Sequence, residues 1–432
     1  MRVAVIGGGG REHALARALA ASPRVERVLA LPGNDGMAAM GVECLGGDPL
    51  DLDGTVRRLA DRRVDLAVVG PEAPLVAGLA DRLEAAGIAV FGPRQAAARI
   101  EGSKAFAKAF MARHGIPTAP GSIFDDPAAA EDFLRRHPGP WVVKADGLAA
   151  GKGVFVCDGT AAALAAVGRL MRRGDLGAAG RRVVIEQRLE GRELSVLALT
   201  DGERVQVLAP ARDYKRLEDG DRGPNTGGMG AFSPVPEVTP ALLDAVRRAI
   251  LEPAVAGLAA EGHPYRGILY AGLMLTAEGP RVLEFNCRWG DPEAQVLVPR
   301  LATDLAGLCW AVATGRLPAT EPAWRPEAAV CVVLAAPRYP DEPAHGLPIT
   351  GLEEAAARPG VFVDHAGTRR QPEGWVTAGG RVLAVTALGP TLAEARRRAY
   401  EAAALIRFPG RRFRRDIAGD GAGAVAAGPD RS

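Results

Sequence analysis

The chain has 432 residues and a formal net charge of +2, which is too small to indicate a nucleic-acid or membrane surface. Its apolar runs are far shorter than the roughly 20 residues of a membrane-spanning helix, and its first residues lack a secretory pattern. The length predicts about three domains, and five scattered cysteines without CxxC spacing exclude a disulfide framework and a zinc site, so we expect free thiols in a soluble cytoplasmic protein.

Residues 1–102 alternate short apolar runs with helical segments. Strands are expected at 3–6, 28–31, 66–69 and 89–91, with a helix over 12–21. This alternation predicts an open parallel α/β sheet. Each expected strand ends in a glycine-rich or polar loop, and ligands of such sheets bind at the carboxyl ends of strands, so these loops should line a site.

The first of these loops, GGGGREHA, differs from the dinucleotide fingerprint. Glu12 stands where the third glycine would be, and no clear acidic ribose ligand follows the second strand, so NAD binding is not indicated. Two interpretations stay open. Backbone N–H groups near Gly9, Gly10 and Arg11 could hold an anion where the helix begins, or the segment is a tight strand-to-helix turn without a ligand.

After a helix expected from Glu101 to about His114, a strand-rich region runs to about residue 320. It contains KADGLAAGKG, residues 144–153, which resembles a P-loop only superficially. Three residues rather than four separate Gly147 from Gly151, and glycine replaces the hydroxyl residue that would reach magnesium. Because β-rich runs flank the segment, we predict a phosphate-sized glycine loop between two strands.

Lysine is scarce in this sequence. Only five of the 53 basic residues are lysines, and arginine supplies the rest. Lysine is a compact point charge that suits a pocket closing on phosphate oxygens, so the lysines in motif segments invite a functional interpretation. We interpret Lys108, one helical turn after Lys104, as an ordinary helix-surface cation.

The strand expected at 282–286 places Glu284 and Asn286 on one face, with Leu283 and Phe285 on the other. Carboxylate and amide oxygens are the ligands that magnesium takes beside nucleotide phosphates and water. The alternative is a half-buried edge strand with a polar face. The charged turn that follows, CRWGDPE, favours the metal site.

Three more segments are candidates for binding. Backbone groups around Arg188 and Leu189, in the turn after the strand at 183–186, could pair with a purine edge, while Glu193 could accept from ribose hydroxyls. The run RDYKR, 212–216, crowds cations around Asp213. The loop GPNTGGMG, 223–230, offers consecutive N–H groups for an anion. A solvated turn, a solvated charge run and a plain loop are the alternatives.

Residues 318–326 are expected to form a linker. Strands predicted at 329–334 and 381–386, with a helix at 392–406, suggest a small α+β module before a flexible tail.

In this order, the motifs resemble those of the glycinamide ribonucleotide synthetase family of ATP-grasp ligases. The match runs from residue 1 to about 418 and includes EGSKAF, DYKR, LYAGLM, EFNCRWGDPE and HAGT. The resemblance implies an α/β and α+β multidomain fold: a parallel α/β N-terminal domain (1–102), an ATP-grasp core of two α+β subdomains (103–325, with a mobile lid at about 118–192), a small α+β C-terminal domain (326–418) and a tail (419–432).

The resemblance also implies a reaction, the ATP-dependent ligation of glycine to 5-phosphoribosylamine through glycyl phosphate, in purine biosynthesis. It implies Mg²⁺ or Mn²⁺ as cofactor and a monomer without nucleic-acid or membrane partners. The residues it implies are, for catalysis, Lys144, Arg288, Asp213 and Lys215; for ATP, Lys104, Lys144, Gly151, Lys152, Gly153, Glu186, Arg188, Leu189 and Glu193; for the other substrates, Gly9, Gly10, Arg11, Glu12, Asn225, Thr226, Gly227, Gly228, Asp291 and Glu293; and for the metal, Glu284 and Asn286.

Departures from the family pattern are Gly8, Arg212 and Trp289, none of which removes an implied phosphate or metal ligand. Two alternatives to the implied function stay open. One is an ATP-grasp ligase for another carboxylate and amine, and the other is a nucleotide-binding relative without catalysis.

Overall fold

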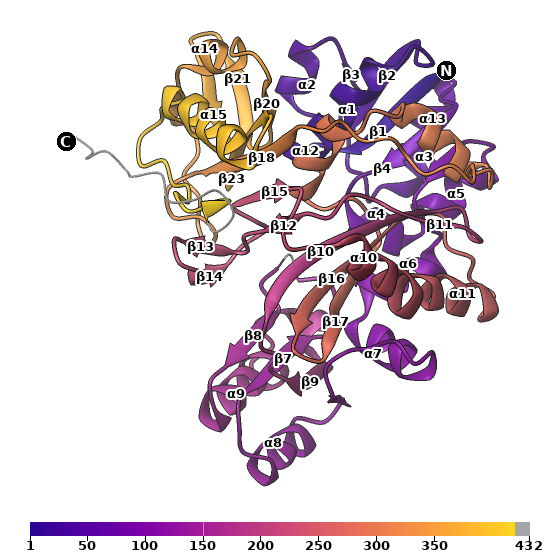
Figure 1. Cartoon of the computed structure of the whole chain (residues 1–432), viewed down its shortest axis with the longest axis vertical. Coiled ribbons are helices and arrows are strands. Elements are labelled where there is room, and N and C mark those ends of the chain that lie inside the picture. The colour runs from indigo at the N-terminus through magenta and orange to yellow at the C-terminus, as the bar shows by residue number, and fades with distance from the viewer. Residues whose placement is uncertain (150, 420–432) are drawn as a thin grey trace.

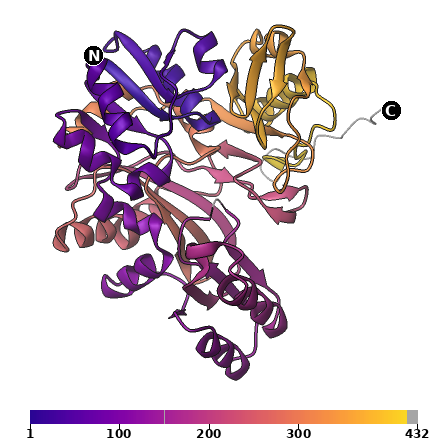
Figure 2. The same ribbon diagram turned by 180° about the vertical axis from the view of Figure 1, so that it is seen from behind.

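A computed structural model describes residues 1–149 and 151–419. Two lobes lie side by side at the top of Figure 1, and a smaller lobe that carries α8 and α9 projects downward; Figure 2 shows the same arrangement from behind. Most of the predicted tail, from residue 420, and Ala150 of the glycine loop lie outside the described residues. Within the described ranges, no helix is long and apolar enough to cross a membrane.

The N-terminal lobe is built on a parallel sheet in the order β3-β2-β1-β4-β5, which confirms the predicted parallel α/β fold. Its strands β1, β2 and β4 are almost fully buried because helices cover the sheet. Its elements are β1 (Arg2–Gly7), α1 (Gly10–Ala20), β2 (Arg27–Pro32), α2 (Asp35–Ala39), β3 (Glu43–Cys44), α3 (Leu52–Asp61), β4 (Leu66–Val69), α4 (Glu72–Ala77), α5 (Leu79–Ala85), β5 (Ala89–Phe91) and α6 (Gln95–Gly102).

The helix predicted from Glu101 to His114 is instead two helices. α6 ends at Gly102, and α7 (Lys104–Arg113) begins after Ser103, whose extended backbone breaks the helix. The Ser103 hydroxyl accepts from the N–H of Phe106 at 3.0 Å, so it caps α7. The break therefore has a local cause, an N-cap serine.

The projecting lobe is an antiparallel sheet in the order β6-β9-β7-β8, named here the lid sheet. The glycine loop joins β7 to β8, two antiparallel neighbours, which confirms the predicted strand-loop-strand arrangement. This lobe has a small hydrophobic core of its own, separate from the main cores. Its elements are β6 (Gly121–Phe124), α8 (Pro127–Arg136), β7 (Trp141–Ala145), β8 (Val154–Cys157), α9 (Thr160–Val167) and β9 (Val183–Gln187).

The middle of the molecule is an antiparallel sheet in the order β11-β10-β16-β17, named here the central sheet. It packs against α7 and the N-terminal lobe through one continuous hydrophobic core. Its strands and the neighbouring helices are β10 (Arg192–Thr200), β11 (Val205–Val207), α10 (Pro240–Val246), α11 (Glu252–Ala260), β16 (Gly267–Thr276), β17 (Gly279–Asn286), α12 (Glu293–Leu297) and α13 (Leu305–Ala313).

The C-terminal lobe shares a sheet with the middle of the chain. The order β12-β15-β18-β23-β20 places two strands from before the predicted linker beside three from after it. We name this the shared sheet. The elements are β12 (Arg212–Asp213), β15 (Gly230–Ser233), β18 (Ala328–Ala335), α14 (Leu352–Ala356), β20 (Val361–His365), β23 (Arg381–Gly389) and α15 (Leu392–Leu405), with small sheets β13 (Arg216–Glu218)–β14 (Arg222–Asn225) and β19 (Pro348–Ile349)–β22 (Gly374–Thr377)–β21 (Thr368–Gln371).

The N- and C-terminal lobes also touch directly. The N–H of His365 on β20 donates to Nδ1 of His13 on α1 at 3.0 Å, and the two rings stack. Burial lowers the pKa of His13 to about 3, so this imidazole stays neutral and free to accept. The HAGT segment therefore fixes how the lobes meet. The five cysteines, all in the described part of the chain, are free thiols as predicted.

Candidate active site

Glu284 and Asn286 project from the end of β17, the edge strand of the central sheet. The Asn286 side-chain oxygen accepts from the Arg288 guanidinium at 3.2 Å. No group of three or more His, Cys, Asp or Glu side chains within residues 1–149 and 151–419 could hold a metal ion. One carboxylate and one amide oxygen fit a cation that takes most of its other ligands from phosphates and water.

Four cations surround the Glu284 carboxylate. Burial acts to raise its pKa, but Lys215, then Lys104, Lys144 and Arg288, together bring the pKa below its usual value. The Lys215 ammonium lies 4.0 Å from the Glu284 carboxylate. These cations come from α7, the lid sheet and the segments after β12 and β17, so the fold gathers them from distant parts of the sequence.

The Lys144 ammonium crosses from the lid sheet to the central sheet. It donates to the main-chain oxygen of Leu283 on β17 at 2.8 Å and forms an ion pair with Glu186 on β9. Glu186 also accepts from Lys108 of α7, whose ammonium lies 2.9 Å from the second carboxylate oxygen. The Glu186 carboxylate is therefore held between two ammonium groups.

The interpretation of Lys108 as a helix-surface cation is wrong. Its ammonium is buried and donates to the Thr118 hydroxyl, the Ala119 main-chain oxygen and Glu186. The face of the helix that carries Lys108 is turned toward the chain segment that enters the lid. The spacing between Lys108 and Lys104 did not reveal this orientation.

Asp146, within the KADG segment, ties the glycine loop to α7. Its carboxylate accepts from the Ser103 hydroxyl at 2.7 Å and from the Ala105 N–H at 2.8 Å, and its main-chain oxygen accepts from the Lys104 N–H at 3.0 Å. The first turn of α7 and the start of the loop therefore form one unit, which holds Lys104 beside the loop.

The glycine loop approaches the loop at 225–230. Gly151 has φ +78°, and a Cβ there would lie 3.4 Å from the Thr226 main-chain oxygen. A Cβ on Gly153 would meet Ala149 at 2.8 Å, so both glycines allow close passage. Lys152 is exposed between them. The loop is thus placed where it could cover a ligand held at β17.

The turn after β9 contains Arg188 and Leu189, whose backbone groups are predicted to contact a purine edge. Arg188 is exposed and pairs with Asp158 at 2.5 Å, so its side chain lies on the lid surface. Leu189 is half-buried, and Glu193 on β10 forms an ion pair with Lys215 at 3.0 Å. Any purine contact at Arg188 would therefore have to use its backbone.

Most of the cations expected around Asp213 bind other residues, and one of them lies beside it. Arg212 pairs with Glu237 and donates to the Glu193 main-chain oxygen, while Arg216 donates to the Gly223 main-chain oxygen. Side chains alternate along a strand, so neighbours of Asp213 point away from it. Lys215, two residues on, is the cation that shares its face.

Asp213 instead belongs to a polar cluster on β10, β16 and α12. The Ser195 hydroxyl donates to Glu293 at 3.0 Å, lies 3.4 Å from Asp213, and shares a 2.9 Å hydrogen bond with the Tyr270 hydroxyl. Burial raises the pKa of Asp213 to about 7; Lys215 opposes this shift, and nearby carboxylates led by Glu293 add to it. Asp213 can therefore exchange a proton near neutral pH.

The N–H groups of the loop at 225–230 are already used. Thr226 donates to the Lys215 main-chain oxygen at 2.7 Å, Gly227 to the Tyr339 hydroxyl at 3.1 Å, Gly228 to the Thr226 hydroxyl at 3.0 Å, and Met229 to the Tyr214 main-chain oxygen at 2.8 Å. In this arrangement the N–H groups of residues 226–229 therefore donate to other parts of the chain. Because buried N–H groups require partners, the fold satisfies them internally.

The backbone N–H group at the helix start near Gly9 also has a hydrogen-bond partner within the chain. The Gly9 N–H donates to the Glu12 carboxylate at 2.8 Å, so α1 is capped by its own glutamate. Arg11 donates to Glu12 at 2.6 Å and to the Trp289 main-chain oxygen at 3.0 Å. A Cβ on Gly70 would lie 2.0 Å from the Glu12 carboxylate. The Glu12 carboxylate therefore lies against this turn, and Arg11 brings the turn beside the segment after β17.

Arg288 is held by two carboxylates of the N-terminal lobe. Its guanidinium lies 2.8 Å from Glu101 and 3.3 Å from Glu72. Glu101 also accepts from the Cys287 N–H at 2.6 Å. Glu72 is the first residue of α4, the helix that follows β4, as expected for a site at the carboxyl edge of the sheet. Arg288 therefore anchors the turn after β17 to that edge.

Asp291 accepts a hydrogen bond from a residue of the C-terminal lobe. Its carboxylate accepts from Gln295 at 2.8 Å and from Arg381 of β23 at 2.8 Å. Although burial acts to raise its pKa, Arg381 and Arg11 hold the pKa of Asp291 below its usual value. Arg381 thus joins the site from the far side of the linker, and no motif in the sequence pointed to it.

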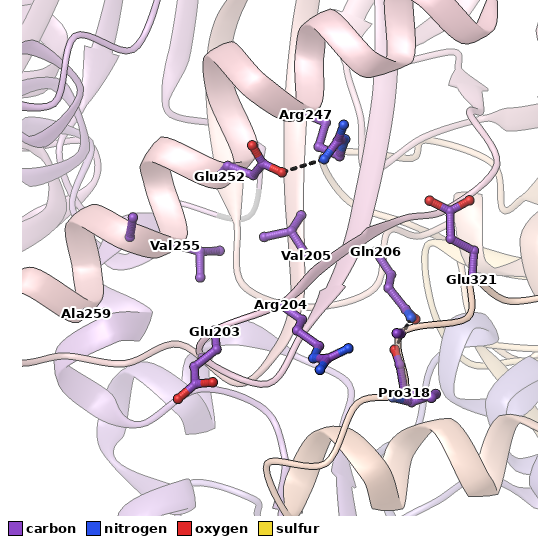
Figure 3. A pocket seen from close by; sticks show the side chains of 13 residues that line it. Glu203, Arg204, Val205, Gln206, Arg247, Glu252, Val255, Ala259, Pro318 and Glu321 are labelled. Carbon is purple, nitrogen blue, oxygen red and sulfur yellow. Dashed lines mark hydrogen bonds and ion pairs between the residues drawn. The ribbon is translucent and has the colours of Figure 1, made fainter.

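A separate surface depression of about 690 Å³ lies between β11, α11 and the segment at 318–321 (Figure 3). Its lining mixes charges, including the Arg247–Glu252 ion pair at 2.6 Å, and contains none of the motif residues. Among the residues that the structure describes, the cluster around Glu284 is instead the place where lysines lie close to carboxylate and amide oxygens, so it is the candidate active site.

A lysine links the antiparallel lid sheet to the central sheet, and Glu284, with cations near it, lies at the junction. This is the arrangement of an ATP-grasp enzyme. Sequence comparison gives the particular family. The ATP-grasp (A) domain of phosphoribosylglycinamide synthetase matches residues 102–294, its N domain residues 1–101 and its C domain residues 329–420. The chain belongs to the phosphoribosylglycinamide synthetase family.

Individual relatives match almost the whole chain. The phosphoribosylamine–glycine ligase of Allochromatium vinosum is 51% identical over 96% of this chain and 98% of its own length. That of Streptomyces coelicolor is 52% identical over 98% of this chain and 100% of its own. A crystal structure of the Thermotoga maritima phosphoribosylamine–glycine ligase superposes with a TM-score of 0.84 at 36% identity, covering 96% of this chain and 100% of that one.

Proposed function

We propose that the chain is an ATP-dependent carboxylate–amine ligase that joins glycine to 5-phosphoribosylamine, giving glycinamide ribonucleotide, ADP and phosphate. The observation that carries the proposal is the position of Glu284 where the two sheets meet. The Lys215 ammonium lies 4.0 Å from its carboxylate, the Lys144 ammonium reaches the main-chain oxygen of Leu283 beside it, and the charges of Lys104 and Arg288 also act to lower its pKa. Membership of the phosphoribosylglycinamide synthetase family supports the choice of substrates.

The proposed reaction has two steps. A glycine carboxylate oxygen attacks the γ-phosphorus of ATP, and ADP leaves with the electrons of the broken P–O bond. The phosphoribosylamine nitrogen then attacks the carbonyl carbon of glycyl phosphate, phosphate leaves, and the nitrogen gives up one proton. Phosphoryl transfer mainly requires positioning and charge neutralisation, which a site rich in ammonium groups provides without a covalent enzyme intermediate.

We assign the triphosphate to Lys104 and Lys144, with the loop of Gly151, Lys152 and Gly153 covering it and excluding water from the acyl phosphate. Mg²⁺ or Mn²⁺ held by Glu284 and Asn286 would neutralise phosphate charge there. Glu186 would act by holding Lys144, and its ion pairs support that role.

The remaining assignments follow the family resemblance. We place adenosine at Glu186, Leu189, Glu193 and the backbone of Arg188. Glycine and phosphoribosylamine are assigned to Asp213, Lys215 and the segments at 9–12, 225–228 and 291–293, which converge through Arg11, Lys215 and Arg381. Arg288 would meet the γ-phosphate or acyl phosphate from its anchored position.

The domain division expected from the sequence is also part of the proposal: 1–102, 103–325 with a lid at 118–192, and 326–418. We further propose that the protein acts in the cytoplasm as a monomer. Sedimentation of the purified protein, with and without ATP, would test the monomer; a dimer at micromolar concentration would reject it.

The deciding experiment measures ADP formation with ATP, magnesium, glycine and freshly made phosphoribosylamine, omitting each substrate in turn. We expect full turnover only with both acceptor substrates present. ADP formation that needs a different carboxylate or amine would identify another ATP-grasp ligase. Nucleotide binding without turnover under every combination would identify an inactive relative.

A further inference from the structure

Arg381, at the start of β23, contacts two segments of the candidate site at once. One guanidinium nitrogen donates to the Asp291 main-chain oxygen at 2.8 Å, to the Gly228 main-chain oxygen at 3.4 Å and to that of Gly227. The other donates to the Asp291 carboxylate at 2.8 Å. A single side chain from beyond the linker therefore joins the loop at 225–230 to the turn after β17.

Both polar backbone groups of Gly227 are bound by the C-terminal lobe. Its N–H donates to the Tyr339 hydroxyl at 3.1 Å, and its main-chain oxygen accepts from Arg381. Tyr339 itself is fitted to this lobe, because a Cβ on Gly380 would lie 2.4 Å from its ring. Gly227 is thus held on two sides by hydrogen bonds with residues that follow the linker.

The glycines of the loop make this grip possible. A Cβ on Gly227 would lie 3.0 Å from the guanidinium carbon of Arg381. Gly228 has φ +107°, and a Cβ there would lie 2.5 Å from the Pro292 ring. Only residues without side chains allow so close an approach on both faces, so the contact is built into the sequence of the loop.

We propose that Arg381, assisted by Tyr339, is a positioning residue that sets the acceptor half of the site, the part that takes phosphoribosylamine and glycine. This inference rests on the proposed function. The planar guanidinium suits the task because it can donate to several oxygens in fixed directions, whereas a lysine ammonium cannot reproduce that fork. Arg381 acts through Asp291, Gly227 and Gly228, which accept the hydrogen bonds of its side chain.

The test is a steady-state comparison of R381K with the wild-type enzyme, varying ATP, glycine and phosphoribosylamine separately. We expect KM for at least one acceptor substrate to rise about tenfold, equivalent to losing one well-aligned charged hydrogen bond. KM for ATP should stay within about twofold, because the side-chain hydrogen bonds of Arg381 within the described residues go to Gly227, Gly228 and Asp291, which we assign to the acceptor half. Y339F should shift the same KM in the same direction by a smaller factor.

The matched control is R398K, which alters another C-terminal arginine that donates to the Leu388 main-chain oxygen at 3.1 Å and to Glu394 at 2.8 Å. Its kinetics should equal those of the wild type. Unchanged acceptor KM values in R381K, or a fall in kcat alone with a lower melting temperature, would overturn the proposal in favour of a simple clamp between lobes.

Two further comparisons cover the case in which R381K does not fold and the case in which the proposed function is wrong. If R381K does not fold, Y339F decides the matter, since it removes one hydroxyl from the same grip: unchanged KM values there would overturn the proposal. Failure of the proposed function gives a different result, because the wild-type enzyme itself would then show no ADP formation dependent on glycine and phosphoribosylamine.

Discussion

Lys108 and Glu186 form a buried ion pair, with 2.9 Å between the ammonium nitrogen and a carboxylate oxygen. The other oxygen of Glu186 pairs with Lys144, which also reaches the main-chain oxygen of Leu283 on the central sheet. The pair therefore supports a lysine that we assign to the triphosphate. It also adds a member to the small set of lysines that an arginine-rich chain retains near this site.

The first prediction concerns Lys108 itself. K108M removes three donors and leaves the Thr118 hydroxyl, the Ala119 oxygen and half of the Glu186 carboxylate without their partner. We expect a loss of about 3–5 kcal/mol in the free energy of unfolding, as is typical when a buried pair is broken, and a raised KM for ATP. Urea denaturation and initial rates measure both. K152M, which removes an exposed ammonium, is the control for stability and should leave it unchanged.

The second prediction concerns Lys144. K144M removes the ammonium that reaches β17 while Lys108 still pairs with Glu186, so the fold should persist. We expect kcat to fall by roughly 100-fold or more, because the variant loses a charge that we assign to the triphosphate. ADP release measures the rate and circular dichroism checks the fold. Turnover at the wild-type rate would refute the assignment.

The third prediction concerns the metal. E284Q keeps the shape of the side chain but removes the charge, so the magnesium concentration needed for half-maximal activity should rise by about tenfold or more. Direct titration with Mn²⁺, followed by electron paramagnetic resonance, gives a readout independent of turnover. E278Q, at the exposed hairpin end of the same strand pair, is the control. Identical titration curves for E284Q and the wild type would exclude Glu284 as a ligand.

The fourth prediction concerns pH. Burial raises the pKa of Asp213 to about 7, opposed by Lys215 and reinforced by nearby carboxylates, whereas the unfolded value is near 3.8. A raised folded pKa stabilises the protein fully below the unfolded pKa, and this contribution is lost as pH rises through about 7. D213N does not titrate, so its stability relative to the wild type should improve on going from pH 5 to pH 8.

The expected size of that change is on the order of 2 kcal/mol. Urea denaturation at both pH values measures it, with D158N on the exposed lid surface as the control. Lys215 keeps Glu193 as its partner in D213N, so the variant should remain folded. A difference between D213N and the wild type that stays constant from pH 5 to pH 8 would contradict the raised pKa.

The sequence predicted the fold where local patterns control it. β4 and β5 have the predicted limits, and the glycine loop joins two strands, because alternation and flanking β-branched residues reflect local backbone preference. The prediction that Glu284 and Asn286 lie on one face of a strand also came from the two-residue periodicity of side chains along a strand. The break at Ser103 was missed because a capping serine and a mid-helix serine look alike within a helical pattern.

The errors within the site concern contacts between distant residues. Arg381 binds Gly227, 154 positions away, and Arg288 binds Glu101, 187 positions away. No spacing rule connects such pairs. The N–H groups of 226–229 looked free in the sequence for the same reason, since their partners include the hydroxyl of Tyr339. The burial of Lys108 depends on where the lid segment enters, which is a property of the whole fold.

The shared sheet limits how this protein could be divided. Its order places β15 against β18 across the predicted linker, so cutting the chain at residues 318–326 would expose the edges of both strands and unfasten Arg381 from its loop. Unpaired strand edges invite aggregation. The two halves are therefore poor candidates for separate expression or for exchange between homologues, and a split version would recover activity only when both fragments are produced together and reassociate.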